Sequence, residues 1–220
     1  MKKRFTPQYI AITAMFTALA FVSVVISEVI PKVSGFLSYE PKDAIIVIAG
    51  FMFGPVSSVI MALLVSFIEL ITISSTGPYG FLMNVIASCA FVLPPTIMYS
   101  KSRNKKSAVI GLVLGVISMT VCMLLWNYII TPLYMNVDRS VVVGMMLPVF
   151  LPFNLVKGGI NASLTLLLYK PVVTALRATH LLKPSESSSG KPKFSLGFSL
   201  IALAVLITFI LTFLALAGIL

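Results

Sequence analysis

Long apolar runs, separated by short segments that carry most of the charge, dominate this sequence. Residues 108–130 and 194–220 are two such runs, and neither contains a charged side chain. Because a helix needs about 20 apolar residues to cross the hydrocarbon core of a bilayer, these runs predict transmembrane helices. Only 10% of all residues are charged, compared with roughly 25% in soluble proteins. The sequence therefore predicts an all-α integral membrane protein.

The order of the apolar runs predicts the organisation of the chain. Seven spans are expected, at residues 10–30, 44–53, 56–74, 81–99, 108–130, 148–169 (or 152–169) and 194–220. The second run is short for a full crossing, and Gly54-Pro55 separates it from the third. We expect a six-span membrane domain over residues 1–178, a basic Ser/Pro-rich linker over residues 179–193, and an additional transmembrane helix over residues 194–220.

The placement of basic residues predicts the orientation in the membrane. If the N-terminus is cytoplasmic, the basic side chains of residues 2–4, 101–106 and 170–193 all face the cytoplasm. The opposite orientation would place this charge outside. We therefore expect a multi-pass protein of the cell membrane with a cytoplasmic N-terminus. The net charge of +10 follows from this topology, so we expect the lipid bilayer and not nucleic acid as a partner.

Several polar side chains fall inside the predicted spans, where each costs free energy unless it has a role. Asn154, Lys157 and Asn161 are spaced i, i+3 and i+7, which places them on one face of a helix. With the predicted orientation, these residues, Asn84 and Asn127 all lie toward the outer side. Two carboxylates, at positions 28 and 69, fall in the same half. The sequence therefore predicts a polar cavity open to the outside, suited to capturing a solute.

Simpler interpretations of these polar residues stay open. Lys157 could form a structural ion pair with Glu69, and a membrane asparagine often joins two helices. An intramembrane enzyme with Glu69 or Lys157 as acid or base is a further alternative, as is a non-catalytic structural membrane subunit. The sequence contains no phosphate-binding loop, no His–Glu metal-binding pair and no Gly-x-Ser-x-Gly element. We therefore expect neither an enzyme nor a metal site, and expect any ATP hydrolysis to occur in other subunits.

The first predicted span contains small residues four positions apart, Ala14 and Ala18. Small residues at this spacing allow another helix to approach closely. The spacing is also compatible with packing inside the bundle.

Several motifs together resemble the riboflavin-specific substrate-capture subunit (S component) of energy-coupling factor (ECF) vitamin transporters. The resemblance covers about residues 8–177. Its most specific parts are Pro-Phe-Asn-Leu-Val-Lys-Gly at residues 152–158, and Asn-Tyr at residues 127–128 followed by Pro-Leu-Tyr at residues 132–134. Supporting parts are Phe-Gly-Pro at residues 53–55, Asn84, and the loop at residues 36–41.

The resemblance implies a fold, a ligand and partners. It implies a six-helix S-component bundle that binds riboflavin as cargo and not as a cofactor. The implied partners are an ECF membrane coupling subunit and two ABC ATPase subunits. Another vitamin or related heterocycle is the alternative ligand. The implied substrate-binding residues are Leu37, Asn84, Asn127, Asn154 and Lys157.

The resemblance also implies that Ala14 and Ala18 dock on the coupling subunit. The last span, residues 194–220, lies outside the six-helix pattern. We expect its removal to leave flavin binding intact.

Overall fold

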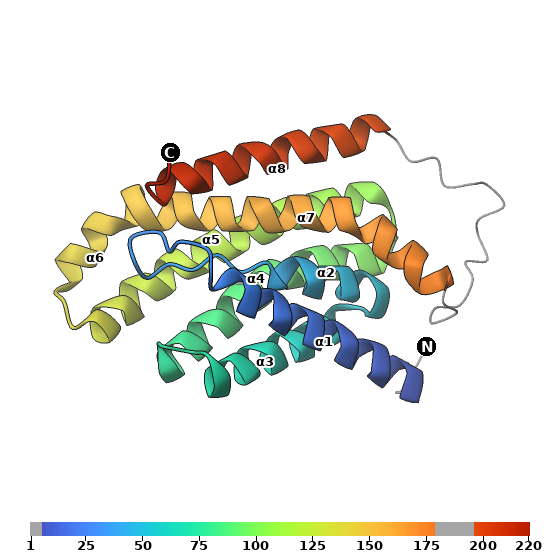
Figure 1. Cartoon of the computed structure of the whole chain (residues 1–220), viewed down its shortest axis with the longest axis horizontal. Helices are drawn as coiled ribbons and strands as arrows, with labels where there is room; N and C mark the ends of the chain where they lie inside the picture. The colour runs from blue at the N-terminus through green and yellow to red at the C-terminus, as the bar shows by residue number, and fades with distance from the viewer. Residues whose placement is uncertain (1–5, 179–195) are drawn as a thin grey trace.

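The computed structural model describes residues 6–178 and 196–220, and this part of the chain is almost entirely helical (Figure 1). The helices are α1 (Pro7–Ser27), α2 (Lys42–Phe53), α3 (Pro55–Thr72), α4 (Gly77–Ser102), α5 (Lys105–Met135), α6 (Arg139–Met145), the π-helical turn η1 (Met146–Phe150), α7 (Leu151–Ala178) and α8 (Leu196–Leu216). The predicted linker at residues 179–193 lies outside the described residues.

Local sequence signals explain several of these helix ends. Thr6 caps α1 by accepting a hydrogen bond from the backbone N–H of Tyr9, and Pro7 occupies the first helical position. Gly54 separates α2 from α3 with φ 94° and ψ 175°, a backbone conformation that favours glycine. Pro55 then begins α3. The predicted break at Gly54-Pro55 is therefore confirmed.

Within the described residues, six helical segments are long and apolar enough to cross a membrane. They are α1, α3, α4, α5, α8 and the continuous segment formed by α6, η1 and α7. That segment starts at Arg139, earlier than the predicted start at Pro148 or Pro152. Large apolar side chains are exposed over these helices, including those of Ile71, Leu125 and Ile201. Such an exterior suits contact with lipid.

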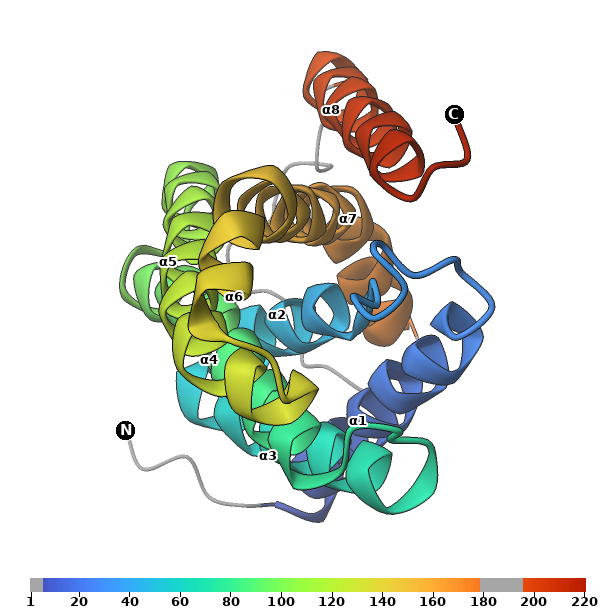
Figure 2. The same ribbon diagram turned by 90° about the vertical axis from the view of Figure 1, so that its left-hand side faces the viewer.

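The short second run forms α2, whose 12 residues are too few for a full crossing. Figure 2, which looks along the bundle, shows α2 enclosed by the other helices. It packs against α1, α3, α4 and α7. From Ala44 onward α2 consists of apolar residues and one glycine, and they are buried on nearly all sides of the helix axis, as expected for a helix enclosed by others. This central position brings the N-terminal end of α2 into the interior of the bundle.

The last helix, α8, lies along α7 (Figures 1 and 2). It corresponds to the predicted additional span at residues 194–220. In Figure 2 it lies outside the ring formed by the other long helices.

Candidate functional site

A cavity opens at the end of the bundle where α1, α3 and α5 end and α4 and α7 begin. The empty space in it is about 1070 Å³, including the part open to solvent, which is enough for a ligand of several rings. All five residues predicted to bind substrate line this cavity: Leu37, Asn84, Asn127, Asn154 and Lys157. The structure thus brings together side chains from four separate segments, while their role in binding stays a prediction.

The loop between α1 and α2, residues 28–41, forms one wall of the cavity. Val33 and Leu37 exchange two backbone hydrogen bonds of 3.0 Å, which close a tight turn. Ser34 and Gly35 occupy this turn with φ of 52° and 79°, the left-handed region that glycine adopts without strain. The turn places Leu37 at the cavity. The ring of the neighbouring Phe36 lies 6.1 Å from that of Phe150.

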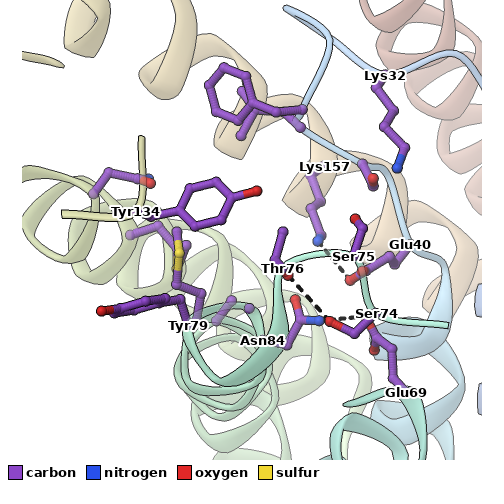
Figure 3. Close-up of a pocket in the computed structure, with 18 of the residues that line it drawn as sticks. Lys32, Glu40, Glu69, Ser74, Ser75, Thr76, Tyr79, Asn84, Tyr134 and Lys157 are labelled. Carbon is purple, nitrogen blue, oxygen red and sulfur yellow. Dashed lines mark hydrogen bonds and ion pairs between the residues drawn. The ribbon is translucent and has the colours of Figure 1, made fainter. Parts of the chain in front are cut away.

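A chain of buried polar side chains, four of them charged, joins this loop to α2, α3, α4 and α7, and Figure 3 shows Glu40, Glu69, Asn84 and Lys157 of this chain. The Nζ atom of Lys157 lies 3.0 Å from Oε2 of Glu40, and Nζ of Lys42 lies 3.1 Å from the same oxygen. Lys42 also lies 2.7 Å from Oε2 of Glu69. The other oxygen of Glu69 accepts a 2.6 Å hydrogen bond from Nδ2 of Asn84. We call these five residues the charge network.

The partner of Lys157 therefore differs from the one considered from the sequence. Lys157 pairs with Glu40 in the loop, whereas Glu69 is held by Lys42 and Asn84. Two lysines and two glutamates balance each other, as buried ions require. Burial alone would raise the pKa of Glu40, but the adjacent Lys157 and Lys42 lower it to about 2. Glu40 is thus ionised and fixes Lys157 at the cavity wall.

Asn127 presents a buried donor without a partner. Its side chain is 1% exposed and its Oδ1 accepts a 2.9 Å hydrogen bond from the hydroxyl of Thr131. Among the residues that the structure describes, its Nδ2 has no hydrogen-bond partner, although Asn127 lines the cavity. A buried amide donor without a partner costs free energy, and a bound ligand with an acceptor would remove that cost.

The two asparagines of α7 have different surroundings. Asn154 lines the cavity, and its Nδ2 donates a 2.7 Å hydrogen bond to the carbonyl of Phe150. Asn161 lies deeper and does not line the cavity. Its Nδ2 donates to the carbonyl of Glu40 at 3.1 Å, and its Oδ1 accepts from the hydroxyl of Tyr39 at 3.3 Å. Asn161 therefore holds the loop and does not face the cavity.

Aromatic and sulfur-containing side chains complete the walls. Tyr79 of α4 and Tyr134 of the neighbouring α5 have ring centres 6.3 Å apart. Met83 and Met123 also line the cavity. Such side chains suit the faces of a flat ligand. Trp126 and Tyr128, which flank Asn127 in the sequence, are not among the residues that line the cavity.

Sequence reasoning alone did not assign several lining residues to the site, among them Glu40, Tyr79 and Thr131. Thr131 was detectable in principle, because it follows Asn127 by four positions and so shares its helix face. Glu40 and Tyr79 lie near helix ends. There the helical repeat of the sequence does not predict the direction in which a side chain points.

Ala14 and Ala18 lie on the exposed face of α1. The side of α1 that packs into the bundle instead carries Ile12, Phe16 and Ala20. Packing within the bundle therefore does not explain the two alanines. The face is open to a further helix.

The chain resembles known membrane transport proteins over most of its length. Residues 8–169 match the family model for the ECF transporter substrate-specific component. A riboflavin transporter of Staphylococcus aureus (strain TCH60), RibU, is 30% identical over 170 residues, which cover 74% of this chain and 89% of the relative. The riboflavin transporter FmnP of Bacillus subtilis (strain 168) is 26% identical over 184 residues, which cover 78% and 97% of the two chains.

A solved structure gives the same result for the fold. The S component of a bacterial ECF transporter is similar with a TM-score of 0.66 and 28% identity, covering 77% of this chain and 98% of that structure. The predicted all-α S-component bundle with an additional C-terminal helix is confirmed, and the protein is a multi-pass protein of the cell membrane. Together, the family model, the relatives and the fold establish that this chain belongs to the substrate-specific (S) components of ECF transporters.

Proposed function

We propose that this S component captures riboflavin at the outer face of the cell membrane for ATP-driven uptake. The observation that carries the proposal is the unpaired amide donor of Asn127, which lines a cavity that also presents the ammonium group of Lys157. The relatives from Staphylococcus aureus and Bacillus subtilis, both named riboflavin transporters, support the choice of ligand.

The chemistry of the cavity suits a flavin. The isoalloxazine ring is flat and has two carbonyl acceptors, ring nitrogens and one imide N–H beside an apolar dimethylbenzene edge. Asn127 can donate through Nδ2 and accept through Oδ1, which matches the imide edge. Lys157 supplies donors for a carbonyl, a ring nitrogen or a ribityl oxygen. Tyr79 and Tyr134 can cover the ring, and Leu37 can close over it from the loop.

The orientation and the partners belong to the same proposal. A cytoplasmic N-terminus places the cavity at the outer face and the basic residues 101–106 inside, in keeping with the positive-inside rule. The exposed alanines at positions 14 and 18 then form the docking face for the ECF membrane coupling subunit. That subunit would connect this chain to two ABC ATPase subunits, which supply the energy.

A binding titration tests the proposed ligand. The purified protein should quench riboflavin fluorescence at nanomolar to low micromolar concentration, and protein from riboflavin-containing medium should be yellow. An unliganded protein that fails to quench, while binding thiamine or biotin tightly, would instead be an S component for another vitamin.

A further inference from the structure

The last helix, α8, makes close contact with α7 at one glycine. A Cβ atom placed on Gly159 would lie 2.4 Å from the ring of Phe209 on α8. Any other residue at position 159 would therefore force the ring of Phe209 or the helix backbone to shift. The family match ends at residue 169, so α8 lies outside the part shared with the family model. The contact at Gly159 indicates that α8 packs against α7 at a defined position.

Further along, α8 reaches the loop that forms the cavity wall. Phe213 is 4% exposed, and its ring centre lies 5.8 Å from that of Tyr39 in an edge-to-face arrangement of 62°. Phe213 and Leu206 belong to one apolar cluster with Val33 and Tyr39 of the loop. The loop residues in this cluster are thus buried by α8 as well as by α7.

From Tyr39, two hydrogen bonds and an ion pair lead to the cavity itself. The Tyr39 hydroxyl donates to Oδ1 of Asn161 at 3.3 Å, and Nδ2 of Asn161 donates to the backbone carbonyl of Glu40 at 3.1 Å. The carboxylate of Glu40 lies 3.0 Å from Nζ of Lys157, which lines the cavity. A continuous series of contacts therefore runs from Phe213 of α8 to a cavity side chain.

We infer that α8 is part of the binding machinery, with Phe213 acting through Tyr39 as a positioning residue for the loop at residues 28–41. The inference rests on the proposed function. With Phe213 in place, the loop keeps Leu37 at the cavity and Glu40 against Lys157. Without it, the apolar side of the loop loses its cover, and segments with few buried contacts open more readily. The ligand would then leave faster.

This inference reverses the expectation from the sequence that the last span is dispensable for binding. The test uses the full-length protein with Phe213→Ala. The matched control is Phe198→Ala, which removes the same side chain from the same helix at a position that is 36% exposed. The first readout is the riboflavin dissociation rate measured after a chase. The second is hydrogen–deuterium exchange of the loop in ligand-free protein.

We expect Phe213→Ala to raise the dissociation rate about fivefold or more and to speed up exchange in the loop, with Phe198→Ala unchanged. In a Tyr39→Ala background, adding Phe213→Ala should change the rate by less than about twofold, because the shared contact is already lost. Rates and exchange equal to those of Phe198→Ala would overturn the inference. So would full additivity of the two substitutions.

The experiment also covers two complications, a Phe213→Ala variant that does not fold and a wild-type protein that binds no riboflavin. If Phe213→Ala does not fold, Phe213→Leu keeps apolar bulk without the ring, and its loop exchange is compared with that of Phe198→Leu. Equal exchange in these two variants would overturn the inference. If the wild-type protein binds no riboflavin, the proposed function fails, whereas the exchange measurement still decides whether α8 holds the loop.

Discussion

The ammonium group of Lys42 lies 2.7 Å from a carboxylate oxygen of Glu69, although the two residues lie on different helices and both are buried. Lys42 is only 1% exposed. It begins α2, the short central helix, so its charge lies inside the bundle and not at a membrane surface. The charge network provides the counterions there. A helix can therefore begin inside a membrane protein because its first residue is paired.

Lys42→Met should destabilise the protein strongly. The substitution leaves Glu69 with only Asn84 as a partner and deprives Glu40 of one lysine. Removing one member of a buried ion pair costs about 3–5 kcal/mol. Unfolding of the ligand-free protein in detergent measures this change. A stability equal to that of the wild type would show that the network does not hold the bundle together.

Lys157→Met should weaken riboflavin binding about tenfold or more, with a smaller loss of stability than Lys42→Met. Glu40 keeps Lys42 at 3.1 Å after this change, so its charge stays paired. The ligand, however, loses a charged donor inside the cavity. Fluorescence titration and unfolding of the same preparation separate the two effects. Normal binding combined with lower stability would mean that Lys157 serves only as a structural ion-pair partner.

Asn127→Leu should reduce riboflavin affinity about tenfold or more and destabilise the ligand-free protein less than Asn161→Leu, because its only side-chain hydrogen bond among the described residues is the one that Oδ1 accepts from Thr131, while Nδ2 is a buried donor without a partner there. Asn161→Leu is the comparison. It leaves the Tyr39 hydroxyl and the Glu40 carbonyl without their partner, so it should lower the unfolding temperature of the ligand-free protein. Equal destabilisation by the two substitutions would argue against a ligand-binding role of Asn127.

The contribution of Glu40 to stability should depend on pH in a defined window. Its pKa falls from the ordinary value of 4.5 to about 2 on folding. The stabilisation is therefore fully present above about pH 4.5 and is lost as the pH falls through about 2. The difference in stability between wild type and Glu40→Gln should be constant from about pH 8 to pH 5.5 and shrink below about pH 4.5. A difference that already shrinks near neutral pH would contradict a lowered pKa.

Ala14→Trp and Ala18→Trp should separate coupling from binding. Both alanines are exposed on α1, away from the cavity, and neither can form a side-chain hydrogen bond with a ligand. Riboflavin affinity of the isolated subunit should stay within a few-fold of wild type. Co-purification with the coupling subunit and ATP-driven uptake in vesicles should be lost, because the larger side chain prevents close approach of a helix.

The matched control for this experiment is Val25→Trp, at an exposed position on the cavity half of the same helix. It should retain co-purification and uptake. Uptake that survives both alanine substitutions would place the docking surface elsewhere.

Much of this protein is determined by the sequence alone, because the relevant forces act locally along the chain. Apolar runs long enough to cross a bilayer predicted the helices, and Gly54-Pro55 predicted the break before α3. The five predicted binding residues do line one cavity. Their convergence was predictable because successive spans cross the membrane in alternating directions. The topology therefore fixes which end of each helix lies on the same side of the membrane. Helical spacing then fixes which residues share a face.

The tertiary structure alone decided which partners meet. Glu40 pairs with Lys157 from 117 positions away in the chain, and Lys42 pairs with Glu69, for which the sequence had suggested only Lys157. Phe213 meets Tyr39 only because α8 lies along α7 at the level of the loop. Ion pairs and ring contacts depend on separations of a few ångströms between distant segments. Hydropathy and periodicity describe one segment at a time, so they cannot choose among such partners.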